Sequence, residues 1–393
     1  MANEENRYIP RLIDLEAVLK NKSCFLFGPR QTGKSLLIRK TLPRYRVYNL
    51  LETDTYLRFS RKPELLRQEC RPEDRCIVID EIQKLPSLLD EVQLLIEERG
   101  IKFLLTGSSA RKLKRSGVNL LGGRARVKYL YPFSYMELKD RFDLTRALNN
   151  GLLPSLYLSQ EPADDLQTYV GTYLKEEIAA EGLTRNIPAF SRFLEVAAAC
   201  NGQLINYTKI ASDAQVARST VQEYFQILKD TLIAFELPCW QASIKRKPLS
   251  TSKFYFFDPG VARFLQNRKE IAAGSPEFGE LFETFIFNEL NIYSQYRGNG
   301  QLAYWRSKSG YEVDFIVDGE TAVEVKASTQ VGLHDLRGLK ALREEKKMKS
   351  HIVICFQNTP RTVDGISVLP WHLFLKKLWE KNRSKASKAG HTP

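Results

Sequence analysis

The segment from Gly28 to Ser35, GPRQTGKS, constrains this chain of 393 residues more than any other. It fits the spacing G-x-x-x-x-G-K-[ST], and it stands between an apolar run, CFLF (24–27), and a helical pattern, SLLIRKTL (35–42). A strand that turns through glycines into a helix presents backbone N–H groups and a positive helix dipole to an anion. The spacing therefore predicts a phosphate-binding loop built from Gly28, Pro29, Arg30, Gln31, Thr32, Gly33, Lys34 and Ser35.

The last two residues of this loop carry the chemistry. Lys34 is predicted to reach the β- and γ-phosphates of a nucleotide, and the Ser35 hydroxyl is predicted to ligate Mg²⁺. The cofactors that we expect are therefore ATP and Mg²⁺, and we expect the chain to hydrolyse ATP.

A second apolar run, CIVID (76–80), ends in two carboxylates, Asp80 and Glu81. Ligands of an open α/β sheet meet the carboxyl ends of its strands. We therefore assign Asp80 to the Mg²⁺ water shell and Glu81 to the attacking water. A third run, KFLLTG (102–107), is followed by small hydroxyl residues, so either Ser108 or Thr106 is expected to contact the γ-phosphate, with a plain turn as the alternative.

The alternation of strand and helix patterns defines the domains. Short apolar runs between helices predict a parallel sheet covered on both faces, so residues 1–150 read as an α/β nucleotide-binding domain. Residues 151–250 read as a helical, winged-helix-like module, and residues 251–377 as a second α/β domain. Residues 378–393 are basic and rich in small residues, and are predicted to form a disordered tail.

Composition limits the class of protein and the partners. The formal net charge of +13 and the pI near 9.3 favour a polyanion partner such as DNA, although a soluble protein that is simply basic has the same values. None of the six cysteines forms a CxxC pair, which argues against a zinc site or a disulfide framework. The N-terminus lacks a signal-peptide pattern and no apolar run reaches membrane-spanning length, so we expect a cytoplasmic protein without a membrane partner.

Residues 205–229 are predicted to form two helices around a short turn. Val221, Tyr224 and Leu228 give the second helix an apolar face. The polar residues that remain are the candidates for DNA contact: Arg218, Thr220 and Gln222. The alternative is a helical connector that packs internally.

Arginines near position 120 offer a further function. The stretch NLLGGR ends at Arg124, which we take as the candidate to stabilise transition-state charge on the ATP of a neighbouring subunit. Arg111 and Arg126 are the next candidates for this role, and the alternative is that Arg124 is an ordinary surface arginine.

Several motifs together resemble those of AAA-type ATPases with a C-terminal DUF4143 domain. They run through nearly the whole chain: YIPR (8–11), GPRQTGKS (28–35), VIDEIQKLP (78–86), LLTGSSARKL (104–113), LLGGRA (120–125), GLLP (151–154), FYFFDPGVAR (254–263), FGELFETFIFNEL (278–290), YWRSKSGYEVDFIV (304–317), AVEVKAS (322–328) and ISVLPWHLFL (366–375). Many relatives have threonine where Ser35 stands, which supplies the same hydroxyl. The resemblance implies a homo-oligomer, often a hexamer, with sites shared between subunits.

The last α/β domain resembles the PD-(D/E)xK nuclease core. Asp314 lies in the strand EVDFIV, and Glu324 and Lys326 lie in AVEVKA. If the two strands pair as a hairpin, these charges converge, and Glu283 from the helix GELFETFIFNEL is placed to join them. The resemblance implies that Glu283, Asp314 and Glu324 hold Mg²⁺ while Lys326 orients water. The alternatives are a solvated hairpin face and a non-cleaving remnant.

Two functions follow from these parts. The first is an ATP-dependent DNA-processing ATPase, a motor or remodeller acting on DNA, including branched forms, with a nuclease-like DNA-binding module. The second is an ATP-switched regulatory protein that recruits a protein partner and cleaves nothing.

Overall fold

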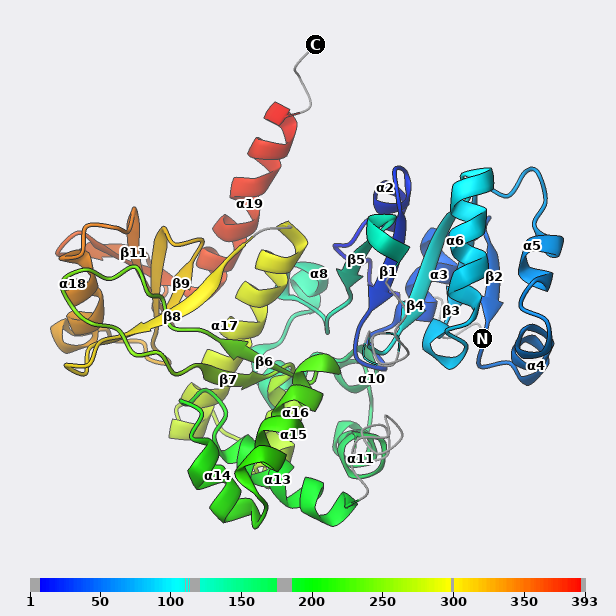
Figure 1. The fold of residues 1–393 in the computed structure, drawn as a ribbon. Coiled ribbons are helices and arrows are strands. Elements are labelled where there is room, and N and C mark those ends of the chain that lie inside the picture. Colours follow the sequence, from blue (N-terminus) through cyan, green and yellow to red (C-terminus); the bar gives the residue numbers. More distant parts are fainter. Residues whose placement is uncertain are drawn as a thin grey trace. The chain divides into compact units, whose positions relative to one another are not determined.

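The computed structural model describes residues 8–109, 111, 113, 121–174, 186–297 and 300–389 (Figure 1). The chain divides into two compact units. The first contains the chain up to Phe133 together with Leu153–Ser155 and Gln226–Ile233, and the second contains the remainder. The C-terminal residues 390–393, which belong to the predicted tail, lie outside the described residues, as do residues 114–120, which include the first two residues of the NLLGGR stretch.

The first unit is built on a five-stranded parallel sheet. Its strand order is β2-β3-β4-β1-β5, and every neighbouring pair is parallel. The strands are β1 (Ser23–Phe27), β2 (Arg46–Asn49), β3 (Cys76–Asp80), β4 (Lys102–Gly107) and β5 (Ala125–Tyr129). Because β1, β3 and β4 are the three predicted apolar runs, the α/β prediction for this part of the chain is confirmed.

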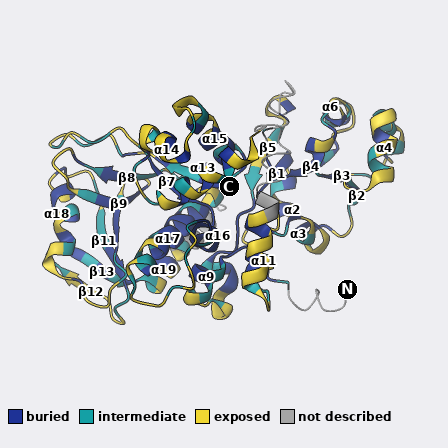
Figure 2. Ribbon diagram, turned by 90° about the horizontal axis from the view of Figure 1, so that it is seen from below, coloured by how far each residue is buried: buried dark blue, intermediate teal, exposed yellow. Residues whose placement is uncertain are grey.

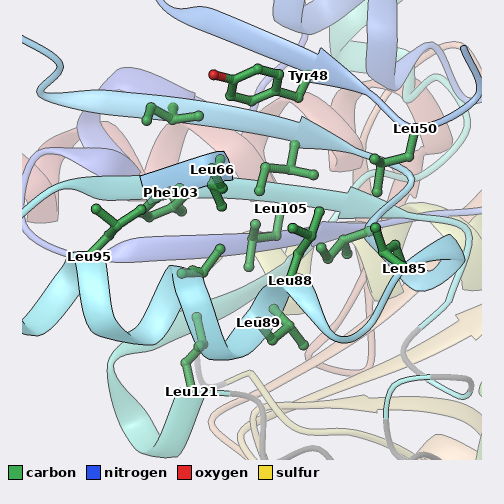
Figure 3. Close-up of a cluster of buried hydrophobic side chains, with 14 of the residues drawn as sticks. Tyr48, Leu50, Leu66, Leu85, Leu88, Leu89, Leu95, Phe103, Leu105 and Leu121 are labelled. Carbon is green, nitrogen blue, oxygen red and sulfur yellow. The ribbon is translucent and has the colours of Figure 1, made fainter. Parts of the chain in front are cut away.

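One helix precedes the first strand of this sheet, and the others follow its strands. They are α2 (Leu15–Leu19), α3 (Lys34–Thr41), α4 (Thr53–Arg61), α5 (Leu65–Glu69) and α6 (Leu88–Arg99), with short 3₁₀ turns η1 (Ile82–Lys84) and η2 (Leu121–Gly123). Leu88, Val92 and Leu95 of α6 recur at helical spacing, and all three are buried. Figure 3 shows Leu88 and Leu95 directed at the strand that carries Phe103 and Leu105. This apolar face fixes α6 on the sheet, and the helix ends at Gly100 with φ of +66°.

The second unit begins with short helices. They are α8 (Tyr135–Leu138), η3 (Lys139–Arg141), α9 (Leu144–Asn150), α10 (Pro154–Tyr157), α11 (Pro162–Thr168) and η4 (Tyr169–Leu174), and α10 begins within Leu153–Ser155 of the first unit. Two motifs of the family resemblance meet here: the Asp258 carboxylate accepts hydrogen bonds from the N–H groups of Leu152, at 2.7 Å, and Val261, at 3.0 Å. Gly151 has φ of +89°, and a Cβ on it would lie 2.2 Å from Asp258. The segments GLLP (151–154) and DPGVAR (258–263) therefore pack against each other.

A winged-helix arrangement follows. The helices α13 (Ile187–Ala199), α14 (Tyr207–Ala214) and α15 (Arg218–Asp230) precede an antiparallel pair, β6 (Ala234–Leu237) with β7 (Lys253–Phe256). Leu204, ahead of α14, forms a further bridge to Lys253. This is the predicted pair of helices around a turn, now with the strands of a wing. The last turns of α15 belong to the first unit.

The C-terminal sheet has six strands in the order β12-β13-β11-β10-β9-β8. Its strands are β8 (Leu302–Arg306), β9 (Glu312–Val317), β10 (Thr321–Val325), β11 (Ser350–Cys355), β12 (Arg361–Val363) and β13 (Ile366–Pro370). The accompanying helices are α16 (Pro259–Leu265), α17 (Pro276–Arg297), η5 (Leu333–Leu336), α18 (Arg337–Arg343) and α19 (Trp371–Ala389). Figures 1 and 2 show α18 on one side of this sheet and α17, which is largely buried, on the other.

Two features differ from the sequence prediction. Residues 378–389, predicted as part of a disordered tail, continue the helix α19 to Ala389. The connection between β6 and β7, which crosses the predicted boundary at residue 250, is bonded to the C-terminal part of the chain. Glu345, which follows α18, accepts hydrogen bonds from the N–H groups of Ile244 (2.7 Å), Lys245 (2.8 Å) and Arg246 (3.0 Å). The winged-helix module and the C-terminal sheet thus form one packed unit.

Candidate functional site

The loop from Gly28 to Ser35 connects β1 to α3, as its motif requires. Gly28 leaves no room for a side chain, because a Cβ there would lie 2.3 Å from the carbonyl oxygen of Leu130. Gly33 has φ of +87° and Gln31 has φ of +61°, the left-handed region in which glycine is the least strained residue. The turn therefore follows from its glycines and from the strand packed beside it.

Side chains of the loop fix its shape. The Lys34 ammonium donates to the carbonyl oxygens of Gly28 at 2.6 Å and Pro29 at 3.1 Å, and the lysine is almost fully buried. The buried Thr32 hydroxyl also donates to Pro29, at 2.8 Å. Gln31 accepts a hydrogen bond from Ser155 at 2.5 Å, and Arg30 is exposed to solvent.

A residue that the sequence reasoning did not single out holds the loop from outside. The Arg11 guanidinium donates to the carbonyl oxygens of Thr32 at 2.7 Å and Tyr131 at 2.6 Å, and it lies 5.0 Å from the ring centre of Phe133. Arg11 belongs to the YIPR segment. That segment could be noticed as part of the resemblance, but nothing local in it shows that the arginine supports the phosphate-binding loop.

Ser35 and Asp80 meet although 45 residues separate them. The Ser35 hydroxyl donates to Asp80 Oδ2 at 2.9 Å, and Thr106 donates to the other oxygen of the same carboxylate. The Glu81 N–H donates to Thr106 Oγ1 at 3.3 Å. Of the two hydroxyls left open by the sequence, Thr106 is the one that contacts Asp80. Ser108 accepts a hydrogen bond from the Gln83 amide at 3.5 Å instead.

Glu81 stands in an uncommon conformation beside these groups. Its φ is +62°, and its carboxylate accepts a hydrogen bond from the Gln83 amide. Burial raises the pKa of Glu81; the nearby Lys34 ammonium acts against this rise and the Asp80 carboxylate adds to it. Strained backbone of this kind is concentrated at functional sites. Gln83, which the sequence reasoning passed over, is therefore a positioning residue for Glu81.

The arrangement fits a nucleotide and its metal ion. Gly28 leaves no room for a side chain, Gly33 has a φ at which a side chain would be strained, and the buried Lys34 lies inside the turn. A hydroxyl with an adjacent carboxylate, Ser35 with Asp80, supplies oxygen ligands of the kind that Mg²⁺ takes. Lys34 would hold the phosphates, and Ser35 and Asp80 would hold the ion.

The three candidate arginines differ in their surroundings. Arg124 forms a salt bridge of 2.7 Å with Glu97, and both side chains are about two-fifths exposed, at 41% and 43%. Arg126 is exposed on β5. Arg111 is mostly buried and bonded to Asp230 at 2.5 Å, so it is the least able of the three to reach another subunit.

The charged residues of the C-terminal sheet come together as the hairpin predicted. Strands β9 and β10 are antiparallel, with Phe315 opposite Val323. Asp314 accepts a hydrogen bond from the Val325 N–H at 2.8 Å, and the Lys326 ammonium lies 2.8 Å from Glu324. Burial raises the pKa of Asp314 and the pKa of Glu324, and each of these pKa values is raised further by a neighbouring carboxylate.

Two residues of β7 enter the same centre. The Tyr255 hydroxyl donates to Glu283 at 2.6 Å. The Lys253 ammonium lies 2.7 Å from Glu312 and 3.6 Å from Glu283. The sequence reasoning missed Lys253 and Tyr255. The signal that could have found them is a lysine directly ahead of a continuous apolar run, FYFF (254–257), which forms a buried strand.

The three carboxylates predicted to hold Mg²⁺ do not form a metal site here. In the part of the chain that the structure describes, no three His, Cys, Asp or Glu side chains are grouped so that they could hold a metal ion. The reason is that Glu283 turns to Tyr255 and Lys253, Asp314 to a backbone N–H, and Glu324 to Lys326. The residues present therefore do not fit the implied ion.

The predicted DNA-contacting residues lie at the start of α15. Arg218 and Gln222 are exposed, and Thr220 is half-buried. The opposite side of the helix carries the buried residues Val221, Tyr224 and Leu228, as its pattern predicted. The pair α14 and α15 contains three basic and three acidic residues, so it has no excess of positive charge.

Fold and loop geometry define a P-loop nucleotide-binding protein of the α/β class. Residues 20–139 match the family model described as AAA domain, and residues 278–374 match a domain of unknown function, DUF4143. The chain is thus an AAA-type P-loop protein with a C-terminal DUF4143 domain, as the motifs indicated. Residues 141–271, between these two, match another domain of unknown function, DUF8612.

Two of the similar proteins are described as uncharacterized. An uncharacterized protein of Mycobacterium tuberculosis is 26% identical over 308 residues, which cover 75% of this chain and 67% of the relative. One of Methanocaldococcus jannaschii is 23% identical over 350 residues, covering 80% and 76%. A solved signal-transduction ATPase with numerous domains, from Pyrococcus horikoshii, is 13% identical and covers 74% of this chain and 49% of its own, but a TM-score of 0.22 supports no conclusion.

Proposed function

We propose that this protein binds ATP with Mg²⁺ through residues 28–35 and 80–81 and hydrolyses it. The observation that carries the proposal is the contact of Ser35 with Asp80 at 2.9 Å, beside the buried Lys34. A hydroxyl, a carboxylate and an ammonium at one strand edge are the groups that phosphoryl transfer requires. ATP supplies the phosphoryl group, and the protein supplies position and charge.

Each residue then has a distinct role. Lys34 exchanges its hydrogen bonds to Gly28 and Pro29 for the phosphate oxygens, which bear the charge that matches its own. Asp80 and Ser35 hold the ion. Glu81 orients and polarises the attacking water, and Gln83 sets the direction of the Glu81 carboxylate. The experiment that tests the proposal is a pair of measurements on purified protein: ATP binding by calorimetry, and phosphate release with and without Mg²⁺.

Arg124 is proposed to complete the site of a neighbouring subunit in a homo-oligomer. Its salt bridge to Glu97 is a surface pair, so little stabilisation is lost when the guanidinium leaves it. We expect Arg124→Ala to retain ATP affinity and to lose hydrolysis by about 10³-fold, the effect of a missing arginine finger. Arg71→Ala, another exposed arginine of this unit, is the control, and hydrolysis at the wild-type rate by Arg124→Ala would remove the role.

We further propose that DNA is the substrate on which the ATPase works. The support is the winged-helix arrangement with exposed Arg218 and Gln222, and the segment 99–136, which has nine basic and no acidic residues. Mobility shifts with duplex, single-stranded and branched DNA, each with and without ATP, should show retardation that weakens steeply with salt. The ATPase rate should rise severalfold with the DNA form that binds.

A matched pair of variants tests whether α15 is the surface that contacts DNA. Arg218→Ala should weaken binding if α15 contacts DNA, whereas Glu223→Ala, on the same helix, should not. If no DNA form binds at moderate salt and hydrolysis ignores DNA, the second function stands: an ATP-switched regulatory protein that recruits a protein partner. The balanced charge of α14 and α15 is the observation that favours it.

No helix in the described ranges is long and apolar enough to cross a membrane.

A further inference from the structure

The centre between α17, β7, β9 and β10 contains four carboxylates, two of them buried and two half-buried, and two lysines. Glu283, Glu312, Asp314 and Glu324 supply the negative charges, and Lys253 and Lys326 supply the positive ones. Arg306, at the rim, also pairs with Glu312, at 3.2 Å. A group of carboxylates held out of water is unstable unless a cation balances it.

Lys253 contacts two of these carboxylates and is close enough to a third, Asp314, to interact with its charge. Its ammonium is 2.7 Å from Glu312 and 3.6 Å from Glu283, and its side chain is only 6% exposed. Burial alone would lower the pKa of Lys253, but the charges of Glu283, Asp314 and Glu312 outweigh burial and raise that pKa, so the lysine keeps its proton. The lysine is also fixed through its backbone, because β7 pairs with β6 at Leu237.

Two further acceptors of the centre are engaged by other donors, whereas the buried Oε2 atom of Glu324 has no hydrogen-bond partner. Tyr255 occupies Glu283 at 2.6 Å, and the Val325 N–H occupies Asp314 at 2.8 Å. A magnesium ion needs near-octahedral oxygen ligands at about 2.0–2.1 Å. Because the Lys253 ammonium lies against Glu283 and Glu312, an ion that took Glu283 as a ligand would have to displace this ammonium.

We propose that Lys253 is the resident cation of this centre and takes the charge-balancing place that a divalent ion would need. The C-terminal centre is then a metal-independent, charge-balanced site, in which a lysine of the winged-helix strand β7 replaces the metal implied by the nuclease-like resemblance. The proposal is independent of the ATP site. It also explains why β7 and its wing are packed into the C-terminal sheet.

The test compares full-length variants that differ in the charge at position 253. All carry Asp80→Asn and are measured without nucleotide, so that the P-loop contributes no metal site. With Lys253 present, Mn²⁺ should neither bind, by electron paramagnetic resonance, nor shift the melting temperature. Lys253→Met leaves the carboxylates without their cation, so it should melt lower than the parent, and Mn²⁺ should raise its melting temperature by several degrees.

Further variants show where the added ion binds. Lys253→Arg keeps the charge and should not respond to Mn²⁺, nor should Lys247→Met, which removes an exposed lysine from the β6–β7 connection. Adding Asp314→Asn to Lys253→Met should abolish the response to Mn²⁺. A Lys253→Met protein that is as stable as its parent, or that is less stable but indifferent to Mn²⁺, would overturn the proposal.

The proposal remains testable if Lys253→Met does not fold. The parent protein alone is then titrated with Mn²⁺ beside its Asp314→Asn variant. Binding that requires Asp314 would show that Lys253 leaves room for a metal ion and would refute the proposal. Absence of such binding at millimolar Mn²⁺ supports it.

Discussion

Lys34→Ala is expected to abolish measurable ATP binding. The ammonium is the one positive charge buried inside the phosphate-binding turn among the residues that the structure describes there, and it faces the oxygens of that turn at 2.6 and 3.1 Å. A hydrogen bond to a charged group is worth about 1.5–3 kcal/mol. Lys34 serves two phosphate groups, so affinity should fall by about 100-fold or more. Calorimetric titration with ATP and Mg²⁺ measures this directly.

The control for this variant is Lys40→Ala, which removes an exposed lysine from the same helix. It should bind ATP as the wild type does. Lys34→Ala also removes the hydrogen bonds from the ammonium to the carbonyl oxygens of Gly28 and Pro29, which can lower stability. A melting curve for each variant therefore distinguishes the loss of a ligand contact from the loss of the fold. Unchanged affinity in a folded Lys34→Ala protein would show that the nucleotide lies elsewhere.

The parts that the sequence predicted well depend on local physics. The segment CIVID is a continuous apolar run because both faces of β3 are covered, and its five residues are all buried. Gly28 stands where a side chain does not fit, and Gly33 stands where φ is positive. In each case the preference belongs to a few neighbouring residues, so it can be read without knowing the rest of the chain.

The parts that escaped prediction depend on contacts between distant segments. Lys253 and Tyr255 meet Glu283 and Glu312 only because three separate elements are aligned by the packing of β7 against α17 and β9. The alternation of residues along a strand indicates on which face of the sheet each side chain lies. It does not indicate which residues of another helix or strand pack against that face. This is why the hairpin pattern brought Asp314, Glu324 and Lys326 together correctly, whereas the metal was assigned to a set that includes Glu283, whose carboxylate contacts Tyr255 and Lys253 instead.

The same limit applies within the ATP site. Asp80 and Glu81 could be predicted from the end of one strand, but the contact of Thr106 with Asp80 requires the register between β3 and β4, in which Ile79 lies opposite Leu105. Likewise, the contact between Gln83 and Glu81 requires the turn η1 that follows the strand. Both depend on geometry that no spacing rule contains.

Glu81→Gln is expected to bind ATP normally and to hydrolyse it about 10²- to 10⁴-fold more slowly, the usual contribution of a positioned base. The substitution keeps the size of the side chain and an oxygen that accepts from Gln83, so the backbone conformation at φ of +62° is retained. What is lost is the negative charge that polarises the attacking water. Phosphate release under single-turnover conditions measures the chemical step, and Glu98→Gln, an exposed carboxyl of the same unit, is the control.

The pH profile distinguishes a base from a merely structural residue at this position. Burial raises the pKa of Glu81, so the carboxyl takes up its proton at a higher pH than an ordinary glutamate does. Hydrolysis requires the carboxylate, and kcat/KM of the wild type should therefore fall as pH decreases through that raised pKa. Glu81→Gln should lack this acid limb, because its amide does not titrate. An acid limb that persists unchanged in Glu81→Gln would assign the titration to another group and leave Glu81 with a role in structure alone.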